Sequence, residues 1–323
     1  MGMRRKIAAA VAMMAAGALT LTGCAGSSNA SSSGGAAAKS YNIGVVVLDL
    51  QDPDLAHMTD AMKKTAEEKG VKLNITDSKK DVGSELNQVE DLLTRQVDAV
   101  IMQPLDGDAS QNAAKRVIAA NIPLFILSTE FADGSNVGYK SYIGVDDTVA
   151  GQMQAEYLNK LMPNGGNLVF AAGIYGASWT DRRKSGFDKT INKNFKIVAE
   201  FQAKGSRDDA KRNMEDTLQR FPSGQIDAVV ANNDEMAIGA ASAIADAGRT
   251  AEFKAVVGVD GTDPALQDIK AGTMSATVRQ DSAGQGVKAV EVVTDFLNGA
   301  NVDNRYTLPF TLITKDNLSE FLK

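Results

Sequence analysis

Most of the chain alternates two patterns of apolar residues, one of short continuous runs and one of apolar positions three or four residues apart. The first run, over residues 43–48, reads IGVVVL, and such a run predicts a strand buried on both faces of a parallel sheet. After it, Leu55, Met58 and Met62 recur at helical spacing, and Gly70 suits the C-terminal cap of a helix. The repetition of this strand–helix pair along the chain predicts an α/β protein.

The boundaries of the elements follow from where each pattern begins and ends. Strands are predicted over residues 43–48, 71–76, 98–102, 122–127, 167–172, 196–202, 228–231, 255–259 and 275–278. Helices are predicted over residues 53–70, 82–96, 109–121, 148–161, 180–194, 208–221, 235–247, 264–271 and 282–298, before an extended segment over 306–313 and a short element over 316–322. A second set of units begins near residue 142. Because neighbouring parallel strands require a right-handed helical crossover, this order predicts two doubly wound parallel-sheet lobes.

The first forty residues have a different pattern, typical of an exported lipoprotein. A basic head precedes an apolar stretch over 7–20, which is too short to span a membrane but suits a signal peptide. The sequence LTGC at 21–24 resembles the bacterial lipobox, where cleavage precedes a cysteine that is lipidated. We predict a signal peptide over 1–23, lipidation at Cys24 and a flexible tether over 24–40, which places the folded part outside the cytoplasmic membrane. The alternative is a signal peptide with a coincidental cysteine.

Composition and charge exclude several classes of function. The 323 residues carry a net charge of −6, whereas a nucleic-acid groove needs concentrated Lys and Arg. One His and one Cys exclude a zinc site, a Cys–His dyad and a disulfide framework, and we expect no metal and no cofactor. The sequence contains no G-x-S-x-G, H-E-x-x-H or G-K-[ST] motif, so we expect a binding protein rather than an enzyme.

Polar side chains follow several of the predicted strands. Ligands of open parallel sheets bind beyond the carboxyl ends of the strands, so these side chains are candidate site residues. They are Asp49, Asp52, Ser128, Thr129, Asn232, Asn233, Asp234, Asp260, Arg279 and Gln280. Two facing lobes would bring them around one cleft. Their carboxylates, amides and hydroxyls suit a neutral polyhydroxy compound, whose hydroxyls both donate and accept hydrogen bonds.

Five motifs carry a resemblance to a known family. They lie at residues 142–151, 183–187, 231–239, 257–262 and 314–321 and read YIGVDDTVAG, RKSGF, ANNDEMAIG, VGVDGT and TKDNLSEF. Together they resemble the ribose/galactose-type periplasmic binding proteins of ABC importers, over about residues 41–323. The resemblance implies two lobes that close on one small ligand about three hinge crossings, near 145/146, 280/281 and 309/310. It assigns to the N-terminal lobe residues 41–145 and 281–309, and to the C-terminal lobe residues 146–280 and 310–323.

The resemblance also implies ligand contacts at individual residues. Asn233, Asp260 and Gln280 match the sugar-hydroxyl ligands of the family. Arg183 matches its sugar-binding arginine, and Asp52 matches the Asp or Asn of its first loop. The implied site is therefore a set of hydrogen-bonding groups drawn from both lobes.

Other positions depart from the family's pattern. Ser128 stands where the family usually has Asp or Asn, and Thr129 stands where ribose binders have Arg. Asp54 and Leu55 stand where the family places aromatic residues that stack on the sugar. Trp179, the only tryptophan, lies one helical turn before the matched arginine, and we expect it to supply a flat surface for the ligand.

Each candidate residue also has a purely structural interpretation. The alternatives are a helix cap at Asp260, a turn at Asn233, an ion pair of Arg183 with Asp181 or Asp188, a backbone bond of Gln280 beside the hinge, and packing of Trp179 against the lobe surface.

We expect a monomeric, lipid-anchored, extracytoplasmic receptor that captures a monosaccharide or polyol by hinge closure. It would deliver this ligand to an ABC permease with a cytoplasmic ATPase, and it would bind no nucleic acid. Two alternatives stay open. One is a ligand sensor of the same fold that reports a sugar or furanose-type signal to a chemoreceptor or sensor kinase, and the other is an exported α/β hydrolase. A sugar-responsive repressor would need a helix-turn-helix head where this chain has a predicted signal peptide.

Overall fold

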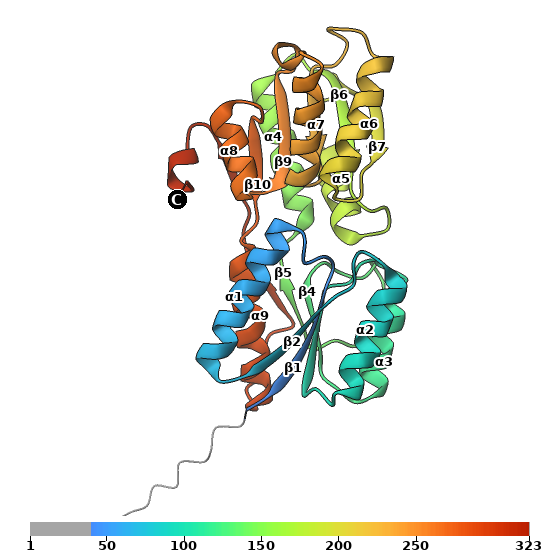
Figure 1. The fold of residues 1–323 in the computed structure, drawn as a ribbon, viewed down its shortest axis with the longest axis vertical. Coiled ribbons are helices and arrows are strands. Elements are labelled where there is room, and N and C mark those ends of the chain that lie inside the picture. The colour runs from blue at the N-terminus through green and yellow to red at the C-terminus, as the bar shows by residue number, and fades with distance from the viewer. Residues whose placement is uncertain (1–39, 323) are drawn as a thin grey trace, which may run out of the picture. The chain divides into compact units, whose positions relative to one another are not determined.

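A computed structural model describes residues 40–322, and the predicted signal peptide, Cys24 and nearly all of the tether lie outside them. The described residues form two lobes, each built on a six-stranded sheet with helices against both faces (Figure 1). The predicted α/β fold of two doubly wound lobes is therefore confirmed. Within residues 40–322, no helix is both long and apolar enough to cross a membrane.

The N-terminal lobe has a parallel sheet in the order β11-β5-β4-β3-β1-β2. Its strands are β1 (Asn42–Val47), β2 (Lys72–Asp77), β3 (Ala99–Met102), β4 (Leu124–Ser128), β5 (Ser141–Gly144) and β11 (Arg305–Thr307). Its helices are α1 (Pro53–Lys69), α2 (Val82–Thr94), α3 (Gln111–Ala119) and α9 (Ser282–Leu297). Helices α1 and α9 cover one face and α2 and α3 the other (Figure 1). This explains why the central strands are apolar on both faces.

The C-terminal lobe has a sheet in the order β12-β10-β9-β8-β6-β7. Its strands are β6 (Gly166–Ala172), β7 (Phe195–Gln202), β8 (Ala228–Ala231), β9 (Ala255–Asp260), β10 (Ala276–Arg279) and β12 (Thr311–Thr314). Its helices are α4 (Asp147–Leu161), α5 (Ser178–Thr190), α6 (Arg207–Arg220), α7 (Asp234–Asp246) and α8 (Asp263–Ala271), with short 3₁₀ turns at Thr250–Glu252 and Leu318–Glu320. The edge strand β12 runs antiparallel to β10, whereas the other described pairs are parallel.

Two boundaries differ from the sequence-based prediction. The extended segment predicted over 306–313 is two strands, β11 and β12, which belong to different sheets and are separated by a crossing at 308–310. The second set of units begins at α4 rather than near residue 142, because β5 pairs with β4 and β11 in the first sheet. The chain also passes between the sheets at 145–146 and at 280–281. Beside these crossings lies an apolar cluster of Val145, Ala150, Val259, Val278 and Phe310.

Helices α4 and α5 pack in unusually close backbone contact because each has a glycine at the crossing. A Cβ atom at Gly151 of α4 would lie 1.8 Å from the carbonyl oxygen of Arg183, and one at Gly186 of α5 would lie 2.0 Å from the carbonyl oxygen of Thr148. Only glycine fits at either position. This contact brings the middle of α5 beside the start of α4, where Asp147 lies.

Candidate ligand-binding site

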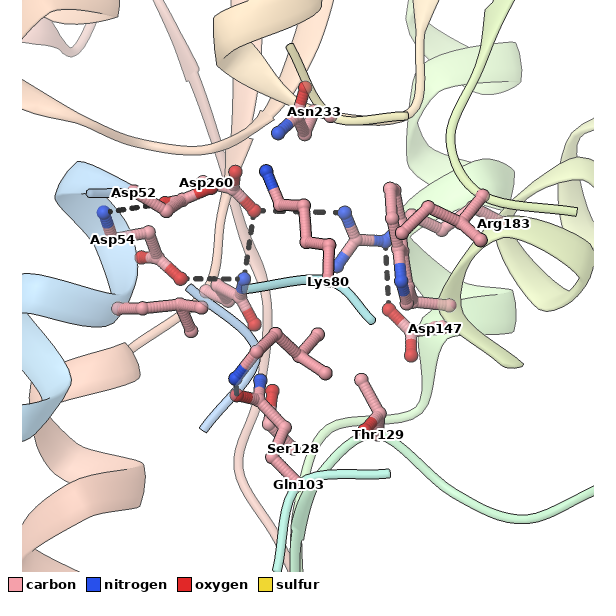
Figure 2. Close-up of a pocket in the computed structure, with 16 residues that line it drawn as sticks. Asp52, Asp54, Lys80, Gln103, Ser128, Thr129, Asp147, Arg183, Asn233 and Asp260 are labelled. Atoms are coloured by element: carbon pink, nitrogen blue, oxygen red, sulfur yellow. Dashed lines mark hydrogen bonds and ion pairs between the residues drawn. The ribbon is translucent and has the colours of Figure 1, made fainter. Parts of the chain in front are cut away.

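The carboxyl ends of strands from both lobes surround a cavity (Figure 2). The cavity is lined by all nine of the predicted ligand-binding residues, which are Asp52, Asp54, Ser128, Thr129, Trp179, Arg183, Asn233, Asp260 and Gln280. Its other lining residues are Leu48, Leu55, Lys80, Gln103, Asp147, Ile174 and Gly205. The structure brings these nine residues together, and their part in ligand binding stays a prediction. Four other strand-end candidates do not line the cavity, namely Asp49, Asn232, Asp234 and Arg279.

Arg183 is the most deeply buried cation of the cavity, with 4% of its surface exposed. Its Nε donates to Oδ1 of Asp147 over 2.8 Å, and its Nη1 donates to the carbonyl oxygen of Asn232 over 2.6 Å. Nη1 also lies 3.6 Å from Oδ1 of Asp260. Burial acts to lower the pKa of Arg183, but the carboxylates of Asp147 and Asp260 outweigh it and raise that pKa. The guanidinium is therefore a fixed positive charge.

The alternative interpretation of Arg183, a surface ion pair with Asp181 or Asp188, is wrong. Neither Asp181 nor Asp188 contacts Arg183, because Arg183 lies on the inner face of α5. Asp188 instead pairs with Lys184, whose Nζ lies 2.6 Å from its Oδ2. Trp179 lies on the same inner face one turn earlier, and the guanidinium carbon of Arg183 lies 5.3 Å from the centroid of its ring. The i, i+4 spacing therefore places a planar cation over an aromatic face.

Two buried carboxylates share one amide. Nε2 of Gln280 donates to Oδ2 of Asp54 over 3.0 Å and to Oδ1 of Asp260 over 2.8 Å, and its Oε1 accepts from Nε2 of Gln285 over 3.1 Å. The hydroxyl of Ser282 also donates to Asp54. Because these bonds use the side chain of Gln280, the alternative of a backbone contact alone is wrong.

Burial and mutual repulsion perturb the acidic groups of the cavity. Burial raises the pKa of Asp54 to about 7. Burial also raises the pKa of Asp260 well above its ordinary value, and the nearby carboxylate of Asp54 raises it further. The pKa values of Asp52 and Asp147 are raised as well, in each case chiefly by burial. A carboxyl group with a pKa near neutrality, such as that of Asp54, can donate or accept a hydrogen bond according to its protonation.

Helix capping explains two of the site residues. Asn233 is the N-cap of α7, where its Oδ1 accepts from the N–H of Met236 over 3.0 Å, and its Nδ2 faces the cavity (Figure 2). Asp52 is the N-cap of α1, where its Oδ1 accepts from the N–H of Asp54 over 3.0 Å. In both cases one atom fixes the side chain on the fold and the other is free to meet a ligand.

Asp260 is not a helix cap, so that alternative is wrong. The N-cap of α8 is Thr262, whose hydroxyl accepts from the N–H of Ala265. Asp260 ends β9 with a φ of 125°, and Ser128 ends β4 with a φ of 62°. Non-glycine residues rarely hold a positive φ, and strained backbone of this kind gathers at binding sites.

Thr129 and Trp179 line the cavity and also make contacts that stabilise the fold. The hydroxyl of Thr129 donates to the carbonyl oxygen of Pro104 over 2.6 Å, so it can only accept from a ligand. Trp179 is 9% exposed and packs in the apolar cluster of the C-terminal lobe, with its ring against Gly173. Its Nε1 is buried without a hydrogen-bond partner among residues 40–322. A buried donor left without a partner is rare in folded proteins and calls for an explanation.

Sequence reasoning missed three polar lining residues. Lys80 follows β2 and pairs through Nζ with Oδ2 of Asp49 at 2.9 Å. Gln103 follows β3, and its Oε1 accepts from the N–H of Leu48 over 3.1 Å. Both lie after strand carboxyl ends, so the same rule applied to β2 and β3 would have found them. Asp147, at the start of α4, could not be found that way, because its importance arises from the contact with Arg183.

The rims of the two lobes touch across the cavity. Arg182 of α5 forms an ion pair with Glu130 and another, over 2.7 Å, with Asp133, both on the loop after β4. The hydroxyl oxygen of Ser178 accepts from the N–H of Glu130 over 2.8 Å. The N–H of Gly107 donates to a carbonyl oxygen on the opposite rim over 2.9 Å. These contacts join the two lobes at the rim of the cavity.

Comparison with known proteins gives the family. Residues 43–301 match the family described as periplasmic binding protein domain. The ribose import binding protein of Bacillus subtilis is 31% identical over 86% of this chain and 88% of its own length. An ABC transporter solute-binding protein of Bacillus halodurans, solved with bound myo-inositol, has a TM-score of 0.82 and 33% identity over 88% of this chain and 98% of its own. One of Actinobacillus succinogenes, solved with bound D-allose, has a TM-score of 0.80 and 26% identity over 87% of this chain and 99% of its own.

These relatives are binding proteins, and four of the five motifs quoted from the sequence fall within the matched residues 43–301. The chain therefore belongs to the periplasmic binding protein family, among the sugar-binding solute-binding proteins of ABC transporters, and it is a binding protein rather than an enzyme.

Proposed function

We propose that this chain is the lipid-anchored receptor of an ABC importer, that it captures a monosaccharide or polyol between its lobes, and that it delivers this ligand to a permease. The observation that carries the proposal is the cavity between the lobes, where Arg183 of α5, Asn233 at the start of α7 and Asp260 at the end of β9 face residues of the other lobe. Relatives bound to myo-inositol and D-allose, and one named for ribose, support a polyhydroxy ligand.

The polar groups of the cavity include both hydrogen-bond donors and acceptors for the hydroxyls of a ligand. Arg183 and the free Nδ2 of Asn233 donate, Asp52 and Asp260 accept, and Ser128 can do both. We propose that the ring or carbon chain of the ligand lies against Trp179, which takes the place of the stacking aromatics absent at 54 and 55. Closure about the crossings at 145–146, 280–281 and 308–310 would bring these groups together, because a ligand that binds the closed form better shifts the population toward it.

A thermal-shift screen tests the receptor. The mature chain, unfolded and refolded to remove bound compounds, is screened against pentoses, hexoses, linear polyols and inositols. A ligand at 100 times its Kd adds about 2.7 kcal/mol to the free energy of unfolding, which corresponds to a rise in Tm of roughly 5–10 °C. The rise should disappear in Asp260→Ala and Asn233→Ala and persist in the exposed controls Asp295→Ala and Asn301→Ala. A site variant that binds as tightly as the wild type would refute the site.

Lipid anchoring at Cys24 and delivery to a permease need separate tests. Cys24→Ser should move the protein from the membrane fraction to the medium or the periplasm, and mass spectrometry of the wild type should find an acylated N-terminal cysteine. Deletion of the gene should abolish uptake of the radiolabelled ligand that the screen identifies. Normal uptake in the deletion strain would contradict the transport role while leaving ligand binding intact. Size-exclusion chromatography with light scattering tests the proposed monomer.

A further inference from the structure

The cavity holds more negative than positive side chains. Four carboxylates line it, from Asp52, Asp54, Asp147 and Asp260, against the two cations of Lys80 and Arg183. Both cations already have partners. Nζ of Lys80 lies 2.9 Å from a carboxylate outside the lining, that of Asp49, and Nε of Arg183 lies 2.8 Å from Asp147. Asp52 and Asp54 are left with no ion pair among residues 40–322, and Asp260 shares Arg183 with Asp147, at the longer distance of 3.6 Å.

The carboxylates of Asp52, Asp54 and Asp260 group on one side of the cavity, opposite Arg183 and Asp147 (Figure 2). Their hydrogen-bond donors are neutral, since Asp54 and Asp260 share the amide of Gln280 and Asp52 accepts a backbone N–H. The guanidinium is 3.6 Å from the nearer oxygen of Asp260, beyond a good hydrogen bond. Neither Oδ2 of Asp52 nor Oδ2 of Asp260 has a hydrogen-bond partner among residues 40–322.

A bound metal ion does not account for this excess. Within residues 40–322, no group of three or more His, Cys, Asp or Glu side chains is arranged to hold one. Buried carboxylates without a full complement of cations are costly, and burial raises the pKa of each of the three. A cationic group of a ligand would offset that cost.

A second observation on the facing wall points to hydroxyls on the same ligand. Asn233 is 5% exposed, and its Nδ2 donates no hydrogen bond among residues 40–322 although it faces the cavity (Figure 2). The buried Nε1 of Trp179 is likewise unpartnered in the described part of the chain. Both groups are donors and need acceptors, which an ammonium group cannot provide and a hydroxyl can. A ligand that pairs with the carboxylates and also with these two donors therefore carries both an ammonium group and hydroxyls.

We propose that the ligand of this cavity is an amino sugar or amino polyol, whose ammonium group lies among Asp52, Asp54 and Asp260 and whose hydroxyls meet Arg183 and Asn233. This inference rests on the proposed function, because it assumes that the cavity captures a small polyhydroxy compound. Beyond the proposed function, the inference states that this compound carries a positive charge. Asp54 is the residue on which it depends most, because its carboxylate is buried and, within residues 40–322, accepts hydrogen bonds only from neutral groups, the amide of Gln280 and the hydroxyl of Ser282.

The test compares matched pairs of compounds by calorimetry on the refolded mature chain at pH 7.5. The pairs are D-glucosamine with D-glucose, D-galactosamine with D-galactose, myo-inosamine with myo-inositol, and 1-amino-1-deoxysorbitol with sorbitol. At least one amine should bind about tenfold or more tightly than its hydroxyl parent, as expected for a charge-assisted contact. Asp54→Asn should remove most of that preference, while Asp60→Asn, an exposed carboxylate on the same helix, should keep it. Thermal unfolding of each variant confirms that it folds.

A second measurement does not depend on the panel. The protein is purified from its native cells without refolding, the bound compound is released by denaturation, and its amine is sought by amine-reactive labelling and mass spectrometry. A released amine supports the inference. A released neutral sugar, or a hydroxyl parent that binds as tightly as its amine in every pair that binds, overturns it while the receptor function stands. If no compound binds and none is released, the proposed function fails and the inference fails with it.

Discussion

Replacement of Arg183 by methionine tests whether the ion pairs of the cavity are structural as well as functional. The side chains are similar in length, but the variant leaves Asp147 buried at 3% exposure with no cation, and it removes the donor to the carbonyl oxygen of Asn232. Removing one partner of a buried ion pair costs about 3–5 kcal/mol, because the other charge stays buried and unpaired. At about 2–4 °C per kcal/mol, we expect a fall in Tm of about 6–20 °C without ligand.

A double-mutant cycle of Arg183→Met with Asp147→Asn distinguishes two causes of this destabilisation, the unpaired buried charge of Asp147 and the simple loss of packing. In the wild type, Asp147→Asn removes a partner of Arg183 and should destabilise the protein. In the Arg183→Met background it removes the unpaired charge and should be neutral or stabilising. Circular dichroism at 222 nm follows thermal unfolding of the four proteins. An equal loss from Asp147→Asn in both backgrounds would refute the ion-pair reasoning.

The pH dependence supplies an independent check on the same variant. Without Arg183, the folded-state pKa of Asp147 rises further above its unfolded value, because burial already raises it and the compensating charge is gone. The folded variant then binds more protons than the unfolded one, so its stability increases as the pH falls. The loss of Tm relative to wild type should therefore be smaller at pH 5 than at pH 7.5. A loss that is the same at both values would contradict the argument.

Three further predictions concern the cavity and its rim. Asp54→Asn should raise the free energy of unfolding without ligand in urea titrations, because burial raises the pKa of Asp54 from 3.8 to about 7; the gain should grow between those pH values and level off above them. Arg182→Gln, which removes the contacts with Glu130 and Asp133, should weaken ligand binding about two- to fivefold in calorimetry, mainly through faster dissociation. Trp179 is the only tryptophan, so its fluorescence should change on titration with a ligand from the screen, and an unchanged spectrum at saturation would place the ligand elsewhere.

The architecture could be predicted because the local patterns are strong. Continuous apolar runs mark strands that are covered on both faces, and caps mark the ends of helices such as α1, which ends at Gly70 in the left-handed conformation. The split of 306–313 into β11 and β12 could not be predicted in the same way. Each is a short edge strand whose partner, β5 or β10, is remote in sequence, so the choice of sheet depends on tertiary contacts.

The site residues could be located from strand ends and the family's motifs, but their partners could not. The contact of Arg183 with Asp147 depends on the glycine-mediated approach of α4 and α5, which no local pattern reveals. The bridge from Gln280 to Asp54 joins residues 226 positions apart and exists only when the lobes are in place. Residue type and position along a strand therefore predict which groups reach the cavity, whereas the charge balance among them emerges from the packing.

That charge balance bears on how closure is controlled. Across the rim, Arg182 is 25% exposed, and ion pairs of this exposure, such as those with Glu130 and Asp133, contribute only about 0–1 kcal/mol. The backbone bond between Gly107 and Gly176 adds about 1 kcal/mol. A ligand can make several charge-assisted hydrogen bonds in the cavity, each contributing about 1.5–3 kcal/mol. Their summed free energy exceeds that of the contacts across the rim. The ligand rather than the rim then sets the population of the closed form, so a permease that recognises both lobes at once would distinguish the loaded receptor from the free one.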